Sequence, residues 1–158
     1  HGNPVVRSKI TIMREIETNS SRDMAGNSGQ KSFDVWNALK KKTHDSIGPD
    51  FFPQEREVWV STIGWNIGRE QNGAVLDFSR PVLVVKKFNN QMFWIVPLST
   101  KQKPYDFYLN FTDPTGLKAS VVLAQLRLIS VKRFLRLLYV FPPETFREVA
   151  SHLKGFFP

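Results

Sequence analysis

The spacing of apolar residues changes near Arg56, and this change separates two kinds of predicted structure. Before it, Phe33, Trp36 and Leu39 recur every third residue after Ser32, which can cap a helix. After it, apolar residues come in short runs of β-branched and aromatic side chains, separated by Gly, Asn and Pro. Such runs are typical of β-strands joined by turns.

The second region predicts a mainly β (α+β) fold, a small antiparallel β-barrel closed by one packing helix. Residues 113–116 give a strong turn signal, and 119–129 is the longest predicted strand. Ser130 can cap a short helical turn after that strand. The predicted strands are residues 57–63, 81–87, 91–98, 105–111, 119–129 and 137–141.

A last helix is predicted after Pro142-Pro143, because proline is well tolerated in a first helical turn. Its apolar residues keep helical spacing, so one face should pack on the sheet. These residues are Phe146, Val149, Ala150, Leu153 and Phe157. The chain is therefore interpreted as a flexible tail or vector-derived segment at 1–30, a helical extension at 31–50 and a barrel domain at 51–158.

Composition adds an uneven distribution of charge. The 158 residues are 41% hydrophobic, which fits a packed globule, and their net charge is +8. Residues 1–55 carry eight Lys and Arg against seven Asp and Glu, whereas residues 56–158 carry fourteen against seven. The predicted barrel therefore holds nearly all of the positive potential, as expected of a surface that meets polyanions. Composition alone leaves open a basic protein with no special partner.

Several kinds of site and location are not expected. The chain has no cysteine, which excludes disulfides and thiolate metal sites. Its three histidines lie far apart without metal-ligand spacing, so a function without metal or cofactor is favoured. No apolar run reaches the ~18–20 residues that span a bilayer, and no basic start leads into an apolar run. A cytoplasmic protein without a membrane partner is the simplest interpretation.

Candidate chemistry lies at the ends of two predicted strands. Arg80-Pro81 opens an apolar strand, and a cation there has to find an anion or water, because an unpaired buried guanidinium is costly. Ser99 and Thr100 end the next strand. An arginine and hydroxyls held at strand ends can bind a phosphate through hydrogen bonds. The alternative is a salt bridge from Arg80 to Asp77 or Glu70.

Five segments of the chain, in their order along the sequence, resemble the PemK/MazF family of toxin endoribonucleases, which share a small SH3-like barrel. The resemblance covers roughly the last hundred residues. There are departures: Ser99 replaces a usual threonine, Ala124 replaces a frequent acidic residue, and the loop at 72–79 is longer, which bears on the RNA sequence preferred. The matching segments are 57–60 (EVWV), 68–71 (GREQ), 79–85 (SRPVLVV), 96–100 (VPLST) and 120–127 (SVVLAQLR).

The resemblance implies a homodimeric toxin that is neutralised by an antitoxin protein and cleaves single-stranded RNA without metal. The ribose 2′-OH would attack its own phosphate, leaving a 2′,3′-cyclic phosphate and a 5′-OH. Arg80 would stabilise the transition-state charge through its fork of donors. Ser99 would donate to a phosphoryl oxygen, with Thr100 supporting or replacing it. Glu70 would orient the arginine or accept the 2′-OH proton.

Further residues are expected to contact RNA. Lys101 and Lys103 follow the hydroxyls and can bind phosphates. Trp65, Phe78 and Tyr105 can stack on unpaired bases, although Tyr105 is as readily a core residue. Arginine and glutamine on the 120–127 segment can serve either the RNA groove or a dimer interface. The remaining expected contacts are Gln71, Gln125 and Arg127.

Two other functions fit the same fold. One is a non-catalytic toxin that binds a protein, as gyrase-poisoning relatives do through their C-terminal helix, and it would depend on residues such as Phe156 and Phe157. The other is a plain RNA-binding barrel with salt-sensitive affinity and no cleavage. The combination of Arg80, Ser99 and Thr100 favours the nuclease.

Overall fold

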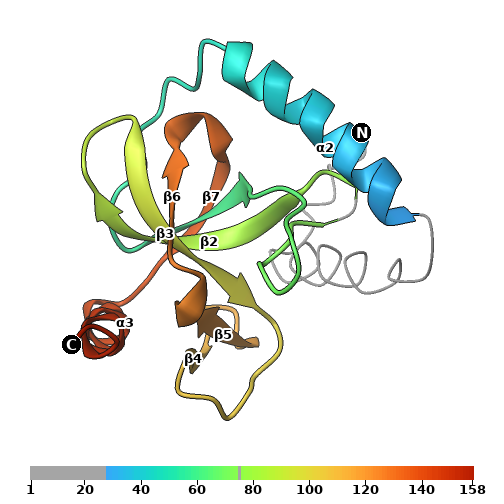
Figure 1. Cartoon of the computed structure of the whole chain (residues 1–158). Coiled ribbons are helices and arrows are strands. Elements are labelled where there is room, and N and C mark those ends of the chain that lie inside the picture. Colours follow the sequence, from blue (N-terminus) through green and yellow to red (C-terminus); the bar gives the residue numbers. More distant parts are fainter. Residues whose placement is uncertain (1–27, 75) are drawn as a thin grey trace, which may run out of the picture.

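The described residues form a seven-stranded antiparallel sheet, with one helix before it and one after it in the sequence (Figure 1). The structure is a computed structural model that describes residues 28–74 and 76–158. The predicted tail at 1–30 lies almost wholly outside the described residues. The strands are β1 (Glu57–Thr62), β2 (Ser79–Lys87), β3 (Met92–Ser99), β4 (Tyr108–Thr112), β5 (Lys118–Val122), β6 (Arg127–Ser130) and β7 (Phe134–Val140).

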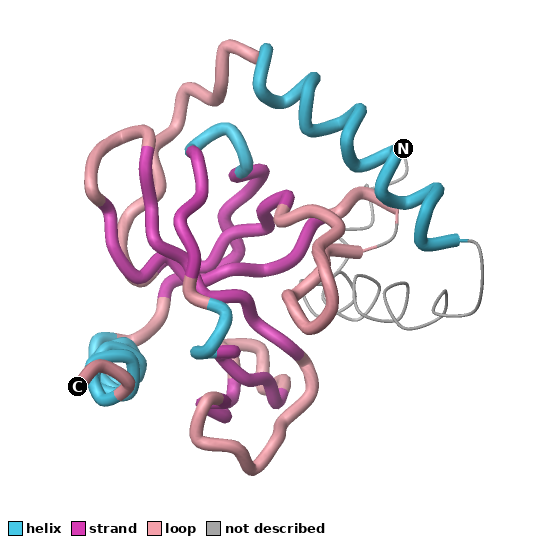
Figure 2. Tube along the Cα trace, in the orientation of Figure 1, coloured by secondary structure: helices cyan, strands magenta, loops and turns pink. Residues whose placement is uncertain are grey.

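Strand β3 organises the sheet, because different parts of it pair with different neighbours. The order is β4-β5-β3-β2-β1-β7, with β6 also paired to β3. The first half of β3 pairs with β6, and its last two residues, Leu98 and Ser99, pair with β5. Figure 2 shows β3 running through the centre of this arrangement. The predicted mainly β fold with an N-terminal and a C-terminal helix is confirmed.

The core has two parts, one on each side of the strongly curved sheet. One contains Trp59, Phe93 and Phe134, with the Phe134 ring packed edge-on against both other rings. The other lies under helix α3 (Pro143–Gly155), whose Val149 and Leu153 are buried. This is the face that the helical spacing predicts. No helix among residues 28–158 is long and apolar enough to cross a membrane, Val75 being left aside.

The predicted single strand at 119–129 is wrong. It breaks into β5, a 3-10 turn η1 (Leu123–Gln125) and β6. The physical reason is that β5 pairs with Leu98 and Ser99 of β3 whereas β6 pairs with Met92–Ile95 in a different register, and the extra residues between the two pairings form the turn. The turn carries the chain from one end of β3 to the other. The capped turn predicted at Ser130 is present as η2 (Val131–Arg133), where the Ser130 hydroxyl accepts a hydrogen bond from the Lys132 amide.

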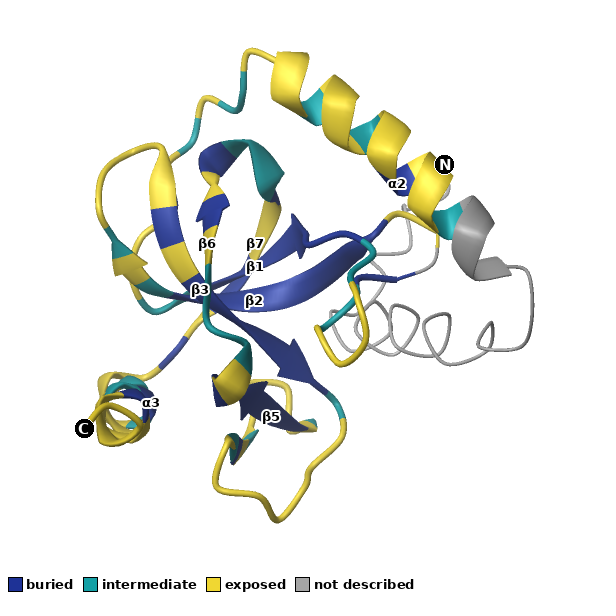
Figure 3. Ribbon diagram, in the orientation of Figure 1, coloured by how far each residue is buried: buried dark blue, intermediate teal, exposed yellow. Residues whose placement is uncertain are grey.

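Helix α2 (Ser28–Asp45) is longer than predicted and is largely exposed (Figure 3). It begins before Ser32, so this serine lies inside the helix and does not form its N-terminal cap. Trp36 is buried, but Phe33 is exposed, so the predicted apolar stripe packs mainly through one ring. At the other end of the chain Phe157 lies beyond α3 and is 66% exposed, so the prediction that it joins the packed face is wrong.

Candidate functional site

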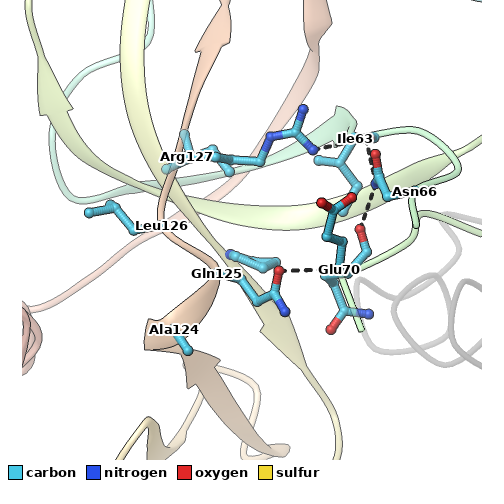
Figure 4. A pocket seen from close by; sticks show the side chains of 10 residues that line it. Ile63, Asn66, Glu70, Ala124, Gln125, Leu126 and Arg127 are labelled. Atoms are coloured by element: carbon cyan, nitrogen blue, oxygen red, sulfur yellow. Dashed lines mark hydrogen bonds between the residues drawn. The ribbon is translucent and has the colours of Figure 1, made fainter. Parts of the chain in front are cut away.

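A pocket of about 290 Å³ opens between the long β1–β2 loop and the segment from η1 to β6 (Figure 4). The loop supplies Asn66, Glu70 and Gln71 to one wall, and Gln125 and Arg127 supply polar groups to the other. Apolar side chains of β3 form part of the lining. The complete lining is Ile63, Asn66, Glu70, Gln71, Ile95, Pro97, Ala124, Gln125, Leu126 and Arg127.

Gln125 connects the two walls. Its Oε1 accepts a hydrogen bond from the Gln71 amide at 3.1 Å, and its Nε2 donates to the carbonyl oxygen of Arg69 at 2.9 Å. The amide side chain therefore pairs with one backbone donor and one backbone acceptor of the loop. The turn at Leu123–Gln125 places this side chain opposite the loop, which a continuous strand would not do.

Inside the loop, two asparagines make the turn that shapes the pocket. The Asn66 side chain donates to the carbonyl oxygens of Ile63 and Gln71. The backbone amide of Asn66 donates to Oδ1 of Asn72 at 2.6 Å. Glu70 accepts a hydrogen bond from the Ile67 amide through Oε2. Sequence reasoning overlooked Asn66 and Asn72. The signal was the loop's richness in Gly and Asn, residues whose side chains or flexibility stabilise turns.

The two ends of the loop meet at one carbonyl group. The oxygen of Phe78 accepts hydrogen bonds from the amides of Ile63, at 2.9 Å, and Gly64, at 3.1 Å. Phe78 has φ of 57°, an unusual backbone conformation for a bulky residue, and its side chain is 2% exposed. Its ring packs 5.4 Å from the ring of Trp36 in α2. The prediction that Phe78 stacks on RNA bases is therefore wrong.

Two guanidinium groups lie side by side at the end of β1. Arg127 donates through Nη1 to the carbonyl oxygen of Ile63, and Arg133 donates through Nη1 to that of Thr62. Burial lowers the pKa of Arg127, and the charge of Glu70 opposes that shift. Burial and the like charge of Arg127 both lower the pKa of Arg133. The pocket is thus bordered by positive charge.

Arg80 lies under the loop and does not line the pocket. Its side chain is 3% exposed. Nε donates to the carbonyl oxygen of Asn72 at 2.7 Å, and Nη1 donates to that of Leu98 at 3.1 Å. Leu98 directly precedes Ser99, so the guanidinium reaches the strand end that carries the predicted hydroxyls. The loop residue Asn72 separates this group from the pocket.

The predicted hydroxyls and lysines follow at the end of β3. Ser99 is buried, and its Oγ accepts a hydrogen bond from the Lys101 amide at 3.1 Å. Thr100 is half-buried, whereas Lys101 and Lys103 are exposed. Lys103 lies with Nζ 5.4 Å from the centre of the Tyr108 ring. These residues therefore lie at the end of β3 and in the connection from β3 to β4.

The structure divides the predicted site residues into two groups. Glu70, Gln71, Gln125 and Arg127 share the pocket, and Arg80, Ser99 and Thr100 lie together at the strand ends beneath and beside the loop. The roles of both groups remain predictions. Outside them, Trp65 is half-buried in the loop, and Tyr105 is 53% exposed and stacked on Phe107, so the alternative that Tyr105 belongs to the core is wrong.

The site has no cluster of potential metal ligands. Among the residues that the structure describes, no group of three or more His, Cys, Asp or Glu side chains lies close enough together to hold an ion. The titratable groups of the pocket are instead one carboxylate, Glu70, and one guanidinium, Arg127.

Comparison with known proteins gives a family match over most of the described chain. Residues 55–157 match the sequence model of the PemK-like, MazF-like toxins of type II toxin–antitoxin systems. A search of curated protein sequences gives no match. The chain before residue 55, including helix α2, lies outside the family match.

Solved structures share the fold at low sequence identity. A MazF of Deinococcus radiodurans superposes with a TM-score of 0.57 and 21% identity, covering 68% of this chain and 97% of that one. A MazE–MazF structure from the same organism gives 0.53 and 18%, covering 68% and 96%. An endoribonuclease of a mycobacterial species, solved with its cognate antitoxin, gives 0.52 and 14%, covering 65% and 92%.

Proposed function

Because the chain belongs to the family of PemK-like, MazF-like toxins of type II toxin–antitoxin systems, we propose that it is an endoribonuclease that cleaves single-stranded mRNA without metal. The observation that carries this proposal is the guanidinium of Arg80, held by two backbone carbonyls next to the strand end that bears Ser99. A preorganised cation in a site of low dielectric stabilises developing negative charge far better than a solvated one.

In the proposed reaction the ribose 2′-OH attacks the adjacent phosphorus, and the bond from phosphorus to the 5′-oxygen breaks. Glu70 accepts the 2′-OH proton, and the leaving oxygen takes up a proton from water to become a 5′-hydroxyl. Arg80 and the hydroxyl of Ser99 or Thr100 donate to the phosphoryl oxygens, where charge accumulates. The second product end is a 2′,3′-cyclic phosphate.

This reaction requires the loop to move. In the described conformation the Arg80 Nε bonds the Asn72 carbonyl, which occupies a donor that the phosphate needs. Displacement of residues 66–72 would free that donor and carry Glu70 toward the strand ends. Loop motions that complete a catalytic arrangement are common among enzymes.

The surrounding residues supply an RNA path. Gln71, Gln125 and Arg127 present polar groups in the pocket, while Lys101 and Lys103 offer charge for phosphates. The exposed part of Trp65 offers a face for base stacking. We propose that these residues are the remaining RNA contacts. By analogy with the relatives solved in complex, the proposed partner is an antitoxin protein. A second copy of the chain is proposed from the family resemblance alone.

The test is cleavage of a mixed-sequence single-stranded RNA in EDTA, with end-group analysis of the products. Arg80→Lys keeps the charge but loses the fork, and Ser99→Ala removes one hydroxyl. Arg80→Lys should lower the cleavage rate by on the order of 10²–10³, and so should Ser99→Ala if its hydroxyl, rather than that of Thr100, is the donor. Arg147→Lys and Ser151→Ala on the exposed face of α3 are matched controls and should cleave normally. The melting temperature of each variant shows whether a lower cleavage rate reflects a missing catalytic group or an unfolded protein. Cleavage that needs a divalent ion, or that Arg80→Lys leaves intact, contradicts the mechanism.

A second candidate function rests on the exposed apolar end of α3. Phe156 is 46% and Phe157 66% exposed, and with Phe107 they border an apolar pocket of about 220 Å³. Such a surface suits a toxin that inhibits a protein by binding it. Growth arrest without RNA breakage that is lost in Phe157→Ala, and kept in Arg80→Lys, would favour this function over the nuclease.

A further inference from the structure

A second pocket, of about 140 Å³, lies between helix α2 and the turn η2. Because α2 precedes residue 55, this pocket is built partly from sequence outside the family match. Its lining includes three cationic side chains and two hydroxyls. The lining residues are Trp36, Lys40, Thr43, His44, Ser130, Lys132 and Arg133.

Two cations of this pocket, Lys132 and Arg133, are held by contacts with other groups. Lys132 Nζ donates to the carbonyl oxygen of His44 at 2.6 Å, near the C-terminal end of the helix. The guanidinium of Arg133 lies 5.5 Å from the centre of the Trp36 ring, and its Nη1 bonds the Thr62 carbonyl. A cation over an aromatic face is attracted by the ring. An incoming anion would therefore meet groups that are already ordered.

The pocket between α2 and η2 adds to the positive charge that borders the first pocket, the one lined by Gln125. Arg133 and Arg127 bond the carbonyls of consecutive residues of the β1 end, and the charge of Arg127 is one cause of the lowered pKa of Arg133. Both groups stay charged at neutral pH, because an arginine titrates far above it. An anion beside this pair would relieve their mutual repulsion.

We propose that the pocket between α2 and η2 binds a backbone phosphate of an RNA strand that also runs through the pocket of Gln125. This proposal rests on the proposed nuclease function. Lys40, Lys132 and Arg133 would supply charge, and Thr43 and Ser130 hydroxyl donors. Arg127 lines one pocket and Arg133 the other, so a ligand that spans both pockets meets a cation in each. An RNA backbone, with a negative charge on every nucleotide, is a ligand of this kind.

The experiment measures binding of the full chain to fluorescein-labelled, single-stranded 2′-O-methyl RNA, which lacks the attacking hydroxyl and stays intact. Fluorescence anisotropy is recorded over a series of salt concentrations. Lys40→Gln/Lys132→Gln removes two charges from the pocket. Lys41→Gln/Lys118→Gln removes two exposed charges elsewhere and is the matched control. Melting temperatures show whether each protein is folded.

The pocket variant should bind several-fold more weakly than the control, and its slope of log affinity against log salt should be shallower by about 0.7 for each phosphate that it no longer neutralises. With cleavable RNA its KM should rise while kcat stays that of the control. Equal slopes and affinities in the two double variants would overturn the phosphate site and leave the nuclease standing. Absence of RNA binding by the unmodified protein would overturn both.

One outcome would reassign the pocket. If the pocket variant bound RNA like the control but lost affinity for an acidic antitoxin peptide, the site would belong to a protein partner, and the RNA proposal would be wrong.

Discussion

The contact between Trp36 and Gly64 allows a quantitative test of how helix α2 holds the loop. Gly64 opens the loop with φ of 93°, and a methyl group added there would overlap Cε2 and Cζ2 of the Trp36 indole. Gly68, within the same loop, has φ of 58°, but a methyl group there would meet no atom within 4 Å. The two glycines therefore share a backbone requirement and differ in packing.

The expected costs follow from this difference. Alanine at a positive φ costs about 1–2 kcal/mol, so Gly68→Ala should destabilise the protein by that amount. Gly64→Ala adds the overlap with the indole, and overpacking costs about 1–3 kcal/mol more. In a Trp36→Ala background the overlap is gone, and Gly64→Ala should cost only about 1–2 kcal/mol, as Gly68→Ala does. A coupling free energy of about 1–3 kcal/mol between the two sites should result.

Urea unfolding followed by far-UV circular dichroism gives the four free energies of this cycle, because that signal does not depend on the tryptophan removed. Hydrogen exchange of residues 64–78 shows whether the loss of stability is local. If Gly64→Ala costs no more than Gly68→Ala, or if its cost is unchanged without the Trp36 ring, then α2 does not rest on the loop and the reasoning is refuted.

Two further predictions concern single side chains. Gln125→Ala removes two hydrogen bonds to the loop, so it should lower the free energy of unfolding by about 1–2 kcal/mol and speed hydrogen exchange at 66–72. The control, Gln102→Ala, removes two hydrogen bonds at the β4–β5 end and should leave exchange at 66–72 unchanged. Tyr139→Phe should melt at the same or a higher temperature, because its buried hydroxyl has no hydrogen-bond partner among the described residues. Burial raises the pKa of Tyr139 above 10.0, so the unfolded chain releases that proton first, and stability should fall above about pH 10. The phenylalanine variant should lack that part of the fall, and an identical alkaline decline in both proteins would contradict the assignment.

The sequence predicted the strands and the last helix well because their patterns are local. Short runs of β-branched and other apolar residues identify β1 and β2, and the spacing of Val149 and Leu153 identifies the buried face of α3. The break between β5 and β6 was missed because three consecutive apolar residues look like a buried strand. Only the pairing of β3 with both segments shows that the chain turns there.

The candidate site was predictable in its residue types but not in its arrangement. A cation and hydroxyls at strand ends were expected, and Arg80 does reach the carbonyl that precedes Ser99. The hydrogen bond from Arg80 to the loop residue Asn72 was not predicted, because it depends on the path of a loop without periodic structure. The role of Gln125 depends on the same loop. Contacts of this kind follow from tertiary structure and leave no local pattern.

The shared acceptor at Phe78 has a consequence for how members of this fold can diverge. Since two neighbouring amides converge on one oxygen, the strands on either side are tied together regardless of what lies between them. Lengthening residues 65–77 would add little closure entropy, because that cost grows only with the logarithm of length. Residues 65–77 can therefore change in length and sequence without disrupting the strands that they connect.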